Sequence, residues 1–431
     1  MAKIGKEYSW LEKTLRFFEK IIPKKIYRTF QPIYHYLLAL SAAIFYWFPG
    51  KKIIVVTITG TKGKTSTVEI INAILEEAGY KTAISSTLRL KIGDVSEKNM
   101  YKMSLRGRFF TQSFLKKAVN SGCQYAIIEV TSEASKQHRH KFLYPDALIF
   151  TNLSPEHIES HGSYENYVQA KLKIGEEVAH SNKKRGVLVT NKDDKESLRF
   201  LNLDIPKKTE YGLGVLDDYE ILDDGLEFRY KGYKFTSRLH GKFNLYNILS
   251  AITYAETQGI SLETMSSAIS KFSGVKGRVE FIDEGQNFKV VVDYAHTADS
   301  LEKLYEVFQN RKKICVLGNT GGGRDKWKRK VMAKVAEKYC SEIILTNEDP
   351  YDEDPRIIVE EMAEAIDSPV SEIIMDRREA ISHAFSHAEQ GDVVLITGKG
   401  TDPYIMEAGG KKTPWSDADV SREELRKLLR K

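Results

Sequence analysis

Cysteine is scarce in this chain: only Cys123, Cys315 and Cys340 carry a thiol among 431 residues. They are odd in number, lie far apart and show none of the close spacings that bind a structural metal. Cys123 and Cys315 lie in or beside apolar, strand-like runs. These features predict a reduced, cytoplasmic protein with buried thiols.

Long apolar runs are also missing. The longest near the N-terminus extends from Tyr36 to Phe48, whereas a membrane-spanning helix needs about 20 residues. Lys24, Lys25 and Arg28 precede this run, and no signal-peptide cleavage site follows it. We expect a helix that packs on the next domain; the alternative is a helix that lies on a membrane surface as a peripheral contact.

Repeats and low-complexity tracts are absent, and the composition is that of a globular protein, 42% hydrophobic and 29% charged. The net charge of +6 suits small anionic substrates such as nucleotides. No nucleic-acid-binding module is recognisable, so we expect no nucleic-acid partner.

The order of patterns predicts the α/β class. Residues 1–50 form a short basic and aromatic leader. Residues 51–275 alternate buried strands with helices, as in a doubly wound, mainly parallel P-loop sheet, with a small antiparallel insert at about 206–240. Residues 276–431 repeat the alternation and predict a C-terminal Rossmann-like α/β domain, whose strands end in polar or glycine-rich loops.

The most informative segment reads IIVVTITGTKGKTSTVEI, from Ile53 to Ile70. A β-branched strand leads into a glycine turn and then a helix, so backbone N–H groups and the helix N-terminus face a bound anion. Lys64 adds a charge for the β- and γ-phosphates, and the Thr65 hydroxyl suits Mg²⁺. Ile58 replaces the first glycine of the usual P-loop. The segment predicts ATP binding.

Two further strand ends carry candidate groups. Glu129 ends the strand YAIIEV, where an acid helps to hold the Mg²⁺ of a P-loop nucleotide. TNLSPEHIESHG supplies His157 and His161. Lys171 follows fourteen residues after His157 on a helix, but the residue pattern alone does not single it out.

Eight motifs occur together in one order: GTKGKTS, IIEVTSEASKQHR, FTNLSPEHIESHGSYENYVQAK, GKFNLYN, VKGRVE, DYAHTADSLE, GNTGGGRDKWKR and GKGTDP. In order and spacing they resemble the Mur ligase family, and most closely its MurE type, the UDP-N-acetylmuramoyl-dipeptide:amino-acid ligases. The resemblance extends from about Ile53 to about Arg422.

The resemblance implies an ATP-dependent acid–amino-acid ligase of peptidoglycan biosynthesis. Its ATP would phosphorylate the acceptor carboxylate to an acyl phosphate, which the incoming amino group attacks, releasing phosphate. It also implies two Mg²⁺ ions and a carbamylated Lys171. The partners would be a nucleotide-sugar peptide and a free amino acid. We expect the C-terminal domain to close on the ATP domain when these ligands bind.

The resemblance also implies roles for individual residues. Those for catalysis are Lys64, Glu129, His157, Lys171 and Arg278. Those for ATP are Gly60, Thr61, Lys62, Gly63, Lys64, Thr65, Ser66, Asn247, Arg278 and Asp293, and those for metal are Thr65, Glu129, His157 and Lys171. The acceptor would contact Ser104, Thr131, Ser132, Arg139 and His296, and the amino acid would contact Arg324, Asp349, Tyr351, Gly398 and Asp402.

Several positions depart from the family pattern. Only the 50-residue leader stands where the MurE type has a uridine-binding domain. Glu133 replaces a histidine, and MSLRGRFF replaces a Thr-Thr-Pro segment. Tyr351 replaces the arginine that clamps meso-diaminopimelate, and acids surround it in the sequence, so we expect a diamino acid such as L-lysine or L-ornithine.

Two other functions stay open. A folylpolyglutamate-synthase-like ligase also lacks a uridine-binding domain, but its loop reads GKGS where this chain has GKTS. A non-catalytic nucleotide-binding scaffold would have no need of the metal-binding residues that the chain retains.

Overall fold

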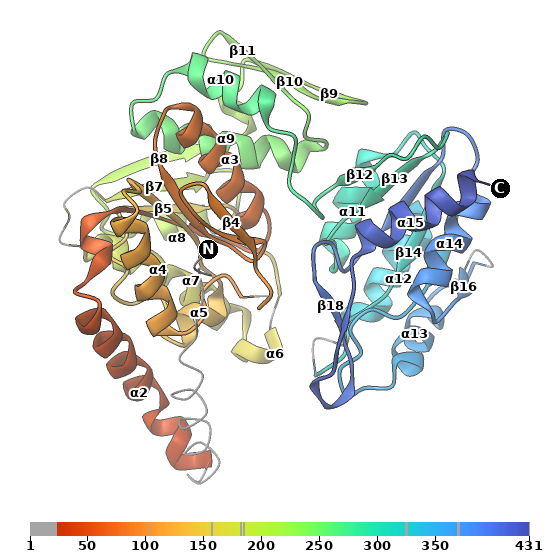
Figure 1. Ribbon diagram of the computed structural model, residues 1–431, viewed down its shortest axis with the longest axis horizontal. Coiled ribbons are helices and arrows are strands. Elements are labelled where there is room, and N and C mark those ends of the chain that lie inside the picture. The colour runs from red at the N-terminus through yellow and green to blue at the C-terminus, as the bar shows by residue number, and fades with distance from the viewer. Residues whose placement is uncertain are drawn as a thin grey trace. The chain divides into compact units, whose positions relative to one another are not determined.

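The computed structural model describes residues 24–101, 103–156, 158–181, 183, 186–323, 326–368 and 371–430. The chain forms two compact units (Figure 1). Unit 1 comprises Met1–Glu220, Glu227–Ser237 and Asn244–Phe272, and unit 2 comprises Ile221–Leu226, Arg238–Phe243 and Ser273–Lys431. Each unit is described by itself.

Unit 1 is built on an eight-stranded sheet of order β4-β3-β2-β5-β1-β6-β7-β8. The pairs from β2 to β8 are parallel, and β3 and β4 add an antiparallel edge. The central strands β1 and β5 are rich in isoleucine and valine and are buried except at Ile54, as a sheet covered on both faces requires. The strands are β1 (Ile54–Thr59), β2 (Thr82–Ser85), β3 (Arg89–Ile92), β4 (Val95–Lys98), β5 (Tyr125–Glu129), β6 (Ala147–Phe150), β7 (Val187–Asn191) and β8 (Lys207–Tyr211).

Helices cover this sheet. α4 (Arg108–Asn120), α7 (Tyr164–Ala179) and α8 (Ser197–Leu201) share one apolar core with it, and α3 (Lys64–Glu77) packs on β1, β2 and β5. α9 (Lys242–Thr257) and α10 (Leu262–Lys271) complete the unit, and α10 packs on α3. Short helices are η1 (Pro49–Lys52), α5 (Ser132–Lys136), α6 (Ile158–His161) and η2 (Leu213–Val215).

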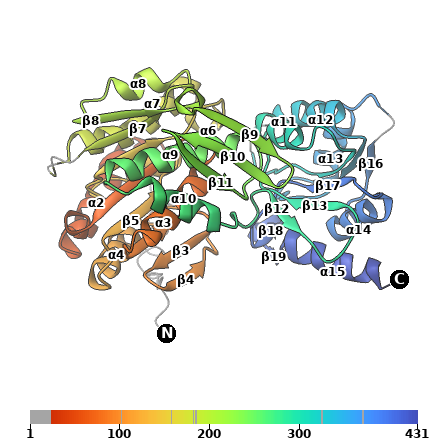
Figure 2. The same ribbon diagram turned by 90° about the horizontal axis from the view of Figure 1, so that it is seen from above.

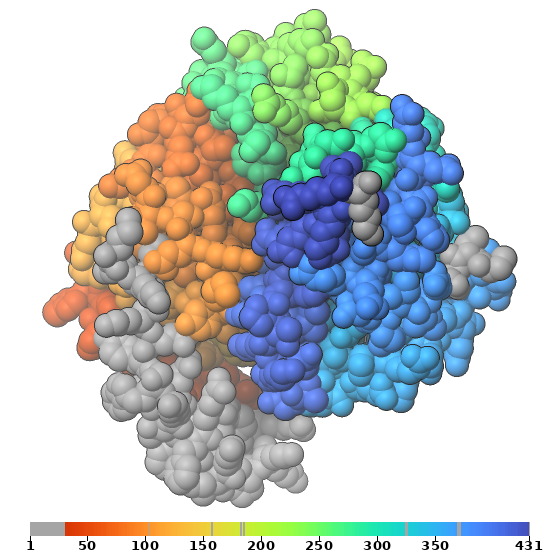
Figure 3. Space-filling model, turned by 45° about the vertical axis from the view of Figure 1, so that its right-hand side comes forward, coloured from red at the N-terminus to blue at the C-terminus, as the bar shows by residue number. Residues whose placement is uncertain are grey.

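A small antiparallel sheet interrupts the alternation, as the sequence predicts, but it begins later than the predicted bound of about 206. Residues 207–211 instead form β8, which pairs in parallel with β7 of the large sheet. The order of the small sheet is β11-β10-β9, with β9 at Asp218–Leu222, β10 at Gly225–Tyr230 and β11 at Tyr233–Ser237. Its atoms, light green in Figure 3, lie at the surface. β11 packs on α10.

Unit 2 is a second α/β layer structure around a six-stranded sheet of order β12-β13-β17-β14-β15-β16. Only β12 is antiparallel to its neighbour among the described pairs. α11, α12 and α13 cover one face, and α14 and α15 cover the other (Figure 2). The fold class is therefore the one predicted.

The strands of unit 2 are β12 (Glu280–Ile282), β13 (Lys289–Val292), β14 (Lys313–Leu317), β15 (Glu342–Leu345), β16 (Ser371–Ile373), β17 (Val393–Ile396), and the separate hairpin of β18 (Tyr404–Met406) and β19 (Lys412–Pro414). Its helices are α11 (Ala298–Val307), α12 (Lys328–Tyr339), α13 (Pro355–Ala363), α14 (Arg377–His387), η3 (Ala408–Gly410) and α15 (Asp417–Leu429).

The N-terminal apolar run forms helix α2 (Lys24–Phe45), which packs against α4. This is the docked helix that the sequence predicts. Among the described residues, no helix is both long and apolar enough to cross a membrane.

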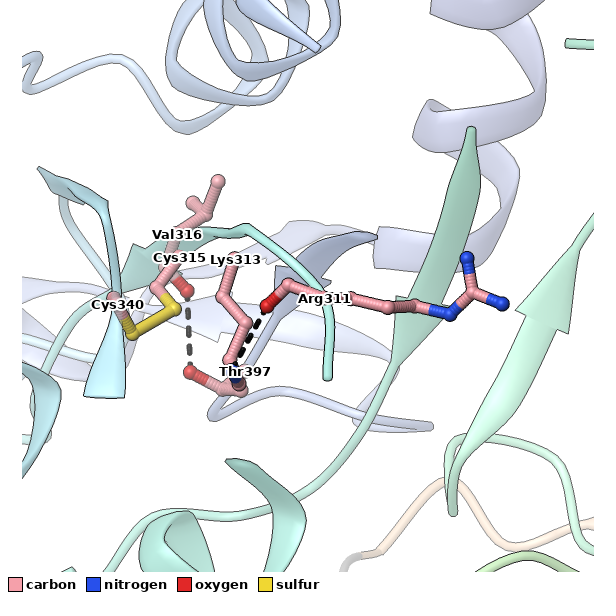
Figure 4. Close-up of a disulfide and its surroundings, with 6 residues drawn as sticks. All are labelled: Arg311, Lys313, Cys315, Val316, Cys340 and Thr397. Carbon is pink, nitrogen blue, oxygen red and sulfur yellow. Dashed lines mark hydrogen bonds between the residues drawn. A yellow bond between two sulfur atoms is a disulfide. The ribbon is translucent and has the colours of Figure 1, made fainter. Parts of the chain in front are cut away.

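The expectation of three reduced thiols is wrong for two of them. Cys315 on β14 and Cys340 at the end of α12 form a disulfide (Figure 4), and Cys123 is the free, buried cysteine. The two cysteines are 25 residues apart, and sequence spacing could not show that the β14–α12 crossover returns one beside the other. Nearby in Figure 4, the Thr397 hydroxyl donates to the Val316 carbonyl.

Candidate active site

The turn between β1 and α3 depends on two glycines in left-handed conformations. Gly60 has φ +149° and Gly63 has φ +82°. A Cβ on Gly60 would lie 1.9 Å from the Thr151 hydroxyl, and one on Gly63 would lie 2.3 Å from the Asn247 Oδ1. No other residue type fits there without displacing a neighbour. Asn247, the predicted adenine contact, therefore lies against the loop between β1 and α3 that the sequence predicts to bind phosphate.

Glu129 is the centre of a cluster of oxygen atoms at the ends of β1, β2 and β5. Its side chain is buried, and its Oε2 accepts hydrogen bonds from the Thr65 hydroxyl at 3.0 Å and from the Thr87 N–H and hydroxyl at 3.1 Å. The structure thus brings together two residues that the sequence proposes as metal ligands. A carboxylate and hydroxyls are the hard oxygen ligands that Mg²⁺ prefers, so this cluster fits that ion.

Lys171 and Lys64 converge on one carbonyl. The Lys171 Nζ donates to the Gly60 oxygen at 2.8 Å and the Lys64 Nζ donates to the same oxygen at 2.9 Å. Lys171 is fully buried, and burial, reinforced by the positive charge of Lys64, lowers its pKa well below the usual value. Lys171 therefore differs from an ordinary surface lysine in two ways. Its amine lies beside the loop between β1 and α3, and its surroundings disfavour the charged form.

The rest of the loop is held by the segment after β6. The Thr61 hydroxyl lies 3.0 Å from the Tyr167 hydroxyl, and the Lys62 Nζ forms a 3.0 Å ion pair with Glu156. The Lys62 N–H donates to the Asn152 side chain at 3.0 Å. Ser66, in the first turn of α3, is buried. His157, adjacent to Glu156, lies outside the described residues.

Two of the predicted acceptor residues, Thr131 and Ser132, lie at the start of α5. Thr131 caps this helix by accepting from the Ala134 N–H, and the Ser132 hydroxyl lies 3.1 Å from His161 Nε2. Glu133, which replaces the family histidine, lies 3.3 Å from the same nitrogen. His161 therefore ties α5 to α6.

The remaining two predicted acceptor residues of unit 1 are Arg139 and Ser104. Arg139 donates to the Leu105 carbonyl at 2.9 Å, next to Ser104. Ser104 is buried, and its hydroxyl has no hydrogen-bond partner among the residues that the structure describes. This hydroxyl belongs to the segment MSLRGRFF, which departs from the family pattern.

In unit 2, three predicted residues lie near the end of β13. The Arg278 guanidinium stacks 4.2 Å above the Tyr294 ring, and the Asp293 carboxylate accepts from the backbone N–H groups of Val279 and Ala295 at 2.7 and 2.6 Å. The His296 Nδ1 lies 2.7 Å from the Tyr294 carbonyl. The loop thus fixes Arg278 and Asp293 on one strand end, as their motifs suggest.

The predicted amino-acid residues gather at the ends of β14, β15 and β17. The Asp349 carboxylate forms a 2.6 Å ion pair with the Lys399 ammonium, and the Asp402 carboxylate lies 3.8 Å from the same ammonium. The Lys399 side chain is fully buried. Tyr351 has φ +52°, and its ring would contact a Cβ added to Gly322. Arg324, two residues beyond Gly322, lies outside the described residues.

Glu348 and Gly398 meet in this group. A Cβ on Gly398 would lie 2.2 Å from Glu348 Oε2. The Thr320 hydroxyl donates to Oε1 at 2.7 Å, whereas Oε2 has no hydrogen-bond partner in the described part of the chain. Burial raises the pKa of Glu348.

Most acids near Tyr351 have structural partners. Asp354 caps α13, the Asp352 carboxylate accepts from the Gly409 N–H, and Glu353 pairs with the buried Arg329 at 2.9 Å. The pKa of Glu353 is lowered to about 2. The sequence suggests a ring of acids around Tyr351, but the structure commits these three to the fold.

Sequence reasoning missed the groups that hold the predicted residues in place. Thr87 contacts Glu129, Glu156 pairs with Lys62, and Lys399 neutralises Asp349. Glu156 and Lys399 lie within quoted motifs, so their position gave a signal. Thr87 follows an ordinary strand and gave none.

Comparison with known proteins agrees with this geometry. Residues 58–255 match the model of the Mur ligase middle domain, and residues 277–400 match that of the Mur ligase, glutamate ligase domain. A UDP-N-acetylmuramoyl-L-alanyl-D-glutamate--2,6-diaminopimelate ligase of Bacillus cereus is 34% identical over 404 residues, covering 90% of this chain and 81% of its own. A UDP-N-acetylmuramyl-tripeptide synthetase of Roseiflexus is 35% identical over 419 residues, with coverages of 91% and 82%.

Solved structures show the same fold. A UDP-N-acetylmuramoyl-L-alanyl-D-glutamate--2,6-diaminopimelate ligase superposes with a TM-score of 0.61 at 27% identity, over 88% of this chain and 79% of that one. A Mycobacterium tuberculosis folylpolyglutamate synthase superposes with a TM-score of 0.68 over 92% and 95%, but at 14% identity, which shows the fold alone. The two domain matches and the relatives above 30% identity establish that the chain belongs to the Mur ligase family of ATP-dependent ligases.

Proposed function

We propose that this protein joins an amino acid to the terminal carboxylate of a UDP-N-acetylmuramoyl-dipeptide-like peptidoglycan precursor in the cytoplasm, at the expense of ATP. Residues 51–275 would bind ATP and residues 276–431 would bind the amino acid. The observation that carries the proposal is the buried Lys171 beside the P-loop, because a nucleotide-binding scaffold would gain nothing from desolvating an amine there.

The proposed reaction has two balanced steps. An acceptor carboxylate oxygen attacks the γ-phosphorus of ATP, and ADP leaves, giving an acyl phosphate. The amino group then attacks the acyl carbon, the carbon–oxygen bond to phosphate breaks, and the amine loses a proton as the amide forms. Lys64, in the P-loop, would stabilise negative charge on the γ-phosphate.

Two Mg²⁺ ions would be held by Thr65, Glu129, His157 and the modified Lys171. Bound there, they would neutralise charge between the acceptor carboxylate and the phosphate. In support, Thr65 and Glu129 already share a hydrogen bond of 3.0 Å, in a cluster of oxygen atoms.

We propose that Lys171 is carbamylated, and its lowered pKa supports this. Only a neutral amine can attack CO₂, forming an N–C bond and releasing a proton, and burial with Lys64 nearby lowers the pKa of Lys171 in that direction. The carbamate formed would be an anion beside Lys64 and would turn a cationic side chain into an oxygen ligand.

For the remaining substrates, we propose that Asn247, Arg278 and Asp293 contact the nucleotide. Thr131, Ser132, Arg139, Ser104 and His296 would contact the acceptor, and Arg324, Asp349, Tyr351, Gly398 and Asp402 would contact the amino acid. Two buried guanidinium groups contact the segment 347–353, and both are already paired with carboxylates: Arg329 with Glu353, and Arg377, which reaches the Asn347 carbonyl, with Asp417. We therefore propose a diamino acid such as L-lysine or L-ornithine, whose side-chain ammonium needs no guanidinium clamp.

The test is product analysis by mass spectrometry after incubation of the full chain with ATP, Mg²⁺, UDP-N-acetylmuramoyl-dipeptide and a mixture of amino acids. We expect one product whose added mass identifies the amino acid, with ATP hydrolysis that needs both substrates. Conversion of a folate with glutamate instead would support the folylpolyglutamate-synthase-like alternative, and no hydrolysis in any mixture would support the scaffold.

Lys171→Ala provides the matched variant. We expect it to abolish turnover, and bicarbonate or short carboxylic acids to restore part of it by replacing the missing anion. Lys91→Ala removes another buried lysine of unit 1, one paired with Glu76 away from the P-loop, and should retain turnover. Full activity of Lys171→Ala without additives would refute the role of the carbamate.

A further inference from the structure

Helix α2 presents an apolar face to solvent. Ile33, Leu37 and Ile44 are 56%, 56% and 55% exposed, and Leu40 between them is half-buried. Their spacing of three or four residues places them on one side of the helix. Exposed apolar side chains aligned in this way mark a contact surface more often than scattered ones do.

The opposite side of α2 already makes the contacts that hold it. His35, Ala39, Ala42 and Ala43 are buried, and the helix packs on α4. In Figure 1, α2 is the red helix that leaves the body of unit 1 beside α4. The outer face therefore adds nothing to the core, and its apolar residues need a separate explanation.

Aromatic side chains border this face. Trp47 and Phe45, at the C-terminal end, are 78% and 61% exposed, and Tyr36 is 41% exposed. Tyr36 and Phe45 each contact a ring of the body, Phe142 and Phe109 respectively, so they lie at the edges of the face. Tryptophan and tyrosine at the margin of an apolar strip are typical of the boundary between lipid headgroups and acyl chains.

Basic residues flank the strip in the sequence. Lys24, Lys25 and Arg28 fall in the first turns of α2, and Lys51 and Lys52 follow it and are exposed. The sequence from Lys20 to Val68 contains no Asp or Glu. This charge pattern complements an anionic surface.

We propose that the outer face of α2, formed by Ile33, Leu37, Leu40 and Ile44, docks onto an anionic lipid bilayer with the helix lying flat in the headgroup region. Trp47, which follows the helix, borders this face. A helix lying on the surface agrees with the absence of any described helix able to cross a membrane. A second copy of the chain is a poorer occupant, because pairing two such faces would bring like charges together. The docking is independent of the ligase reaction.

The test is co-sedimentation of the full chain with vesicles of phosphatidylcholine alone and of phosphatidylcholine mixed with phosphatidylglycerol. We expect binding to the mixed vesicles, weakening as salt rises, and weaker binding to the neutral ones. Leu37→Glu with Ile44→Glu should weaken binding to mixed vesicles at least about tenfold, because charged groups cannot enter the acyl boundary. Lys51→Glu with Lys52→Glu should lower binding only to the mixed vesicles.

Matched controls place the same charge elsewhere. Leu198 in α8 and Ile357 in α13 are also exposed, at 70% and 53%, so Leu198→Glu and Ile357→Glu should bind vesicles like the parent. Unchanged thermal unfolding would confirm that every variant is folded. No vesicle binding by the parent, or equal losses in the controls, would overturn the proposal. So would a concentration-dependent dimer that Leu37→Glu with Ile44→Glu abolishes, which would make the face an interface between copies.

Discussion

Comparing Gly63→Ala with Gly79→Ala separates the effect of backbone strain from the effect of a collision inside the predicted phosphate-binding loop. Gly63 and Gly79 flank the same helix, α3, and have nearly equal φ angles, +82° and +84°. A Cβ at Gly63 would lie 2.3 Å from Asn247 Oδ1, whereas one at Gly79 would meet nothing within 4 Å. The two alanine variants therefore share the strain and differ only in the collision.

The shared strain is about 1–2 kcal/mol, the cost of a left-handed conformation for an L-residue. At Gly63 the Asn247 amide must also move, which breaks its 2.9 Å hydrogen bond to Asn244 and adds about 1 kcal/mol. We expect Gly63→Ala to be about 2–3 kcal/mol less stable than the parent and Gly79→Ala about 1–2 kcal/mol. Urea denaturation measures both.

The binding of ATP should show a larger contrast. Gly63→Ala displaces the backbone N–H groups that would face the phosphates together with the predicted adenine contact, so we expect at least about a tenfold loss of ATP affinity, equal to about 1.4 kcal/mol. Gly79→Ala should bind ATP like the parent, as measured by titration calorimetry. Equal ATP affinities of the two variants would refute the assignment of this loop as the phosphate site.

Three further predictions concern other parts of the chain. Burial lowers the pKa of His35 to about 4 and that of His140 to about 3, so the folded state resists protonation of both rings. The free energy of unfolding should be constant above about pH 7 and fall as pH drops from 6.5 towards 4, by about 1–2 kcal/mol for each histidine at pH 5. Urea titrations should show a smaller loss for His35→Gln. Cys340→Ser removes the disulfide that closes a loop of 25 residues, so thermal unfolding should show unit 2 to be about 3–4 kcal/mol less stable. Dithiothreitol should destabilise the parent by a similar amount and leave the stability of the variant unchanged. In competition assays L-lysine or L-ornithine should be added in preference to meso-diaminopimelate, and Tyr351→Arg should shift the preference towards meso-diaminopimelate; a clear preference of the parent for meso-diaminopimelate would contradict the reasoning.

Local patterns were enough to predict much of the fold. The residue pattern predicts helices at Ser66–Ala78, at about Thr111–Ser121 and at Tyr164–Ala179, and these are α3, α4 and α7. The predicted bounds of α7 are correct, because Ser163 caps it and its apolar residues keep one face. The expected starts of α3 and α4 were two or three residues late, since charged residues at Lys64 and Arg108 open these helices. The β3–β4 hairpin was not predicted, because β4 is mostly exposed and lacks the apolar alternation of a buried strand.

The candidate site was predictable where motifs follow strand ends, and less so where partners come from elsewhere. Thr65 and Glu129 are adjacent because parallel strands bring their carboxyl ends to one edge. The partners of the acids near Tyr351 come from α12 and the η3 loop, and no local pattern indicates them. The low pKa of Lys171 also depends on burial, which its position on a helix does not reveal.

The most direct test of the central claim follows one oxygen atom. The acceptor is labelled with ¹⁸O in its terminal carboxylate and incubated with the full chain, ATP, Mg²⁺ and the amino acid identified above. Mass spectrometry then measures both the ligated product and the released phosphate. We predict one amide product for each ADP formed and one ¹⁸O atom in the phosphate, because the bond between the acyl carbon and the phosphate oxygen breaks. Phosphate without label, or ATP hydrolysis without an amide product, would contradict the proposed function.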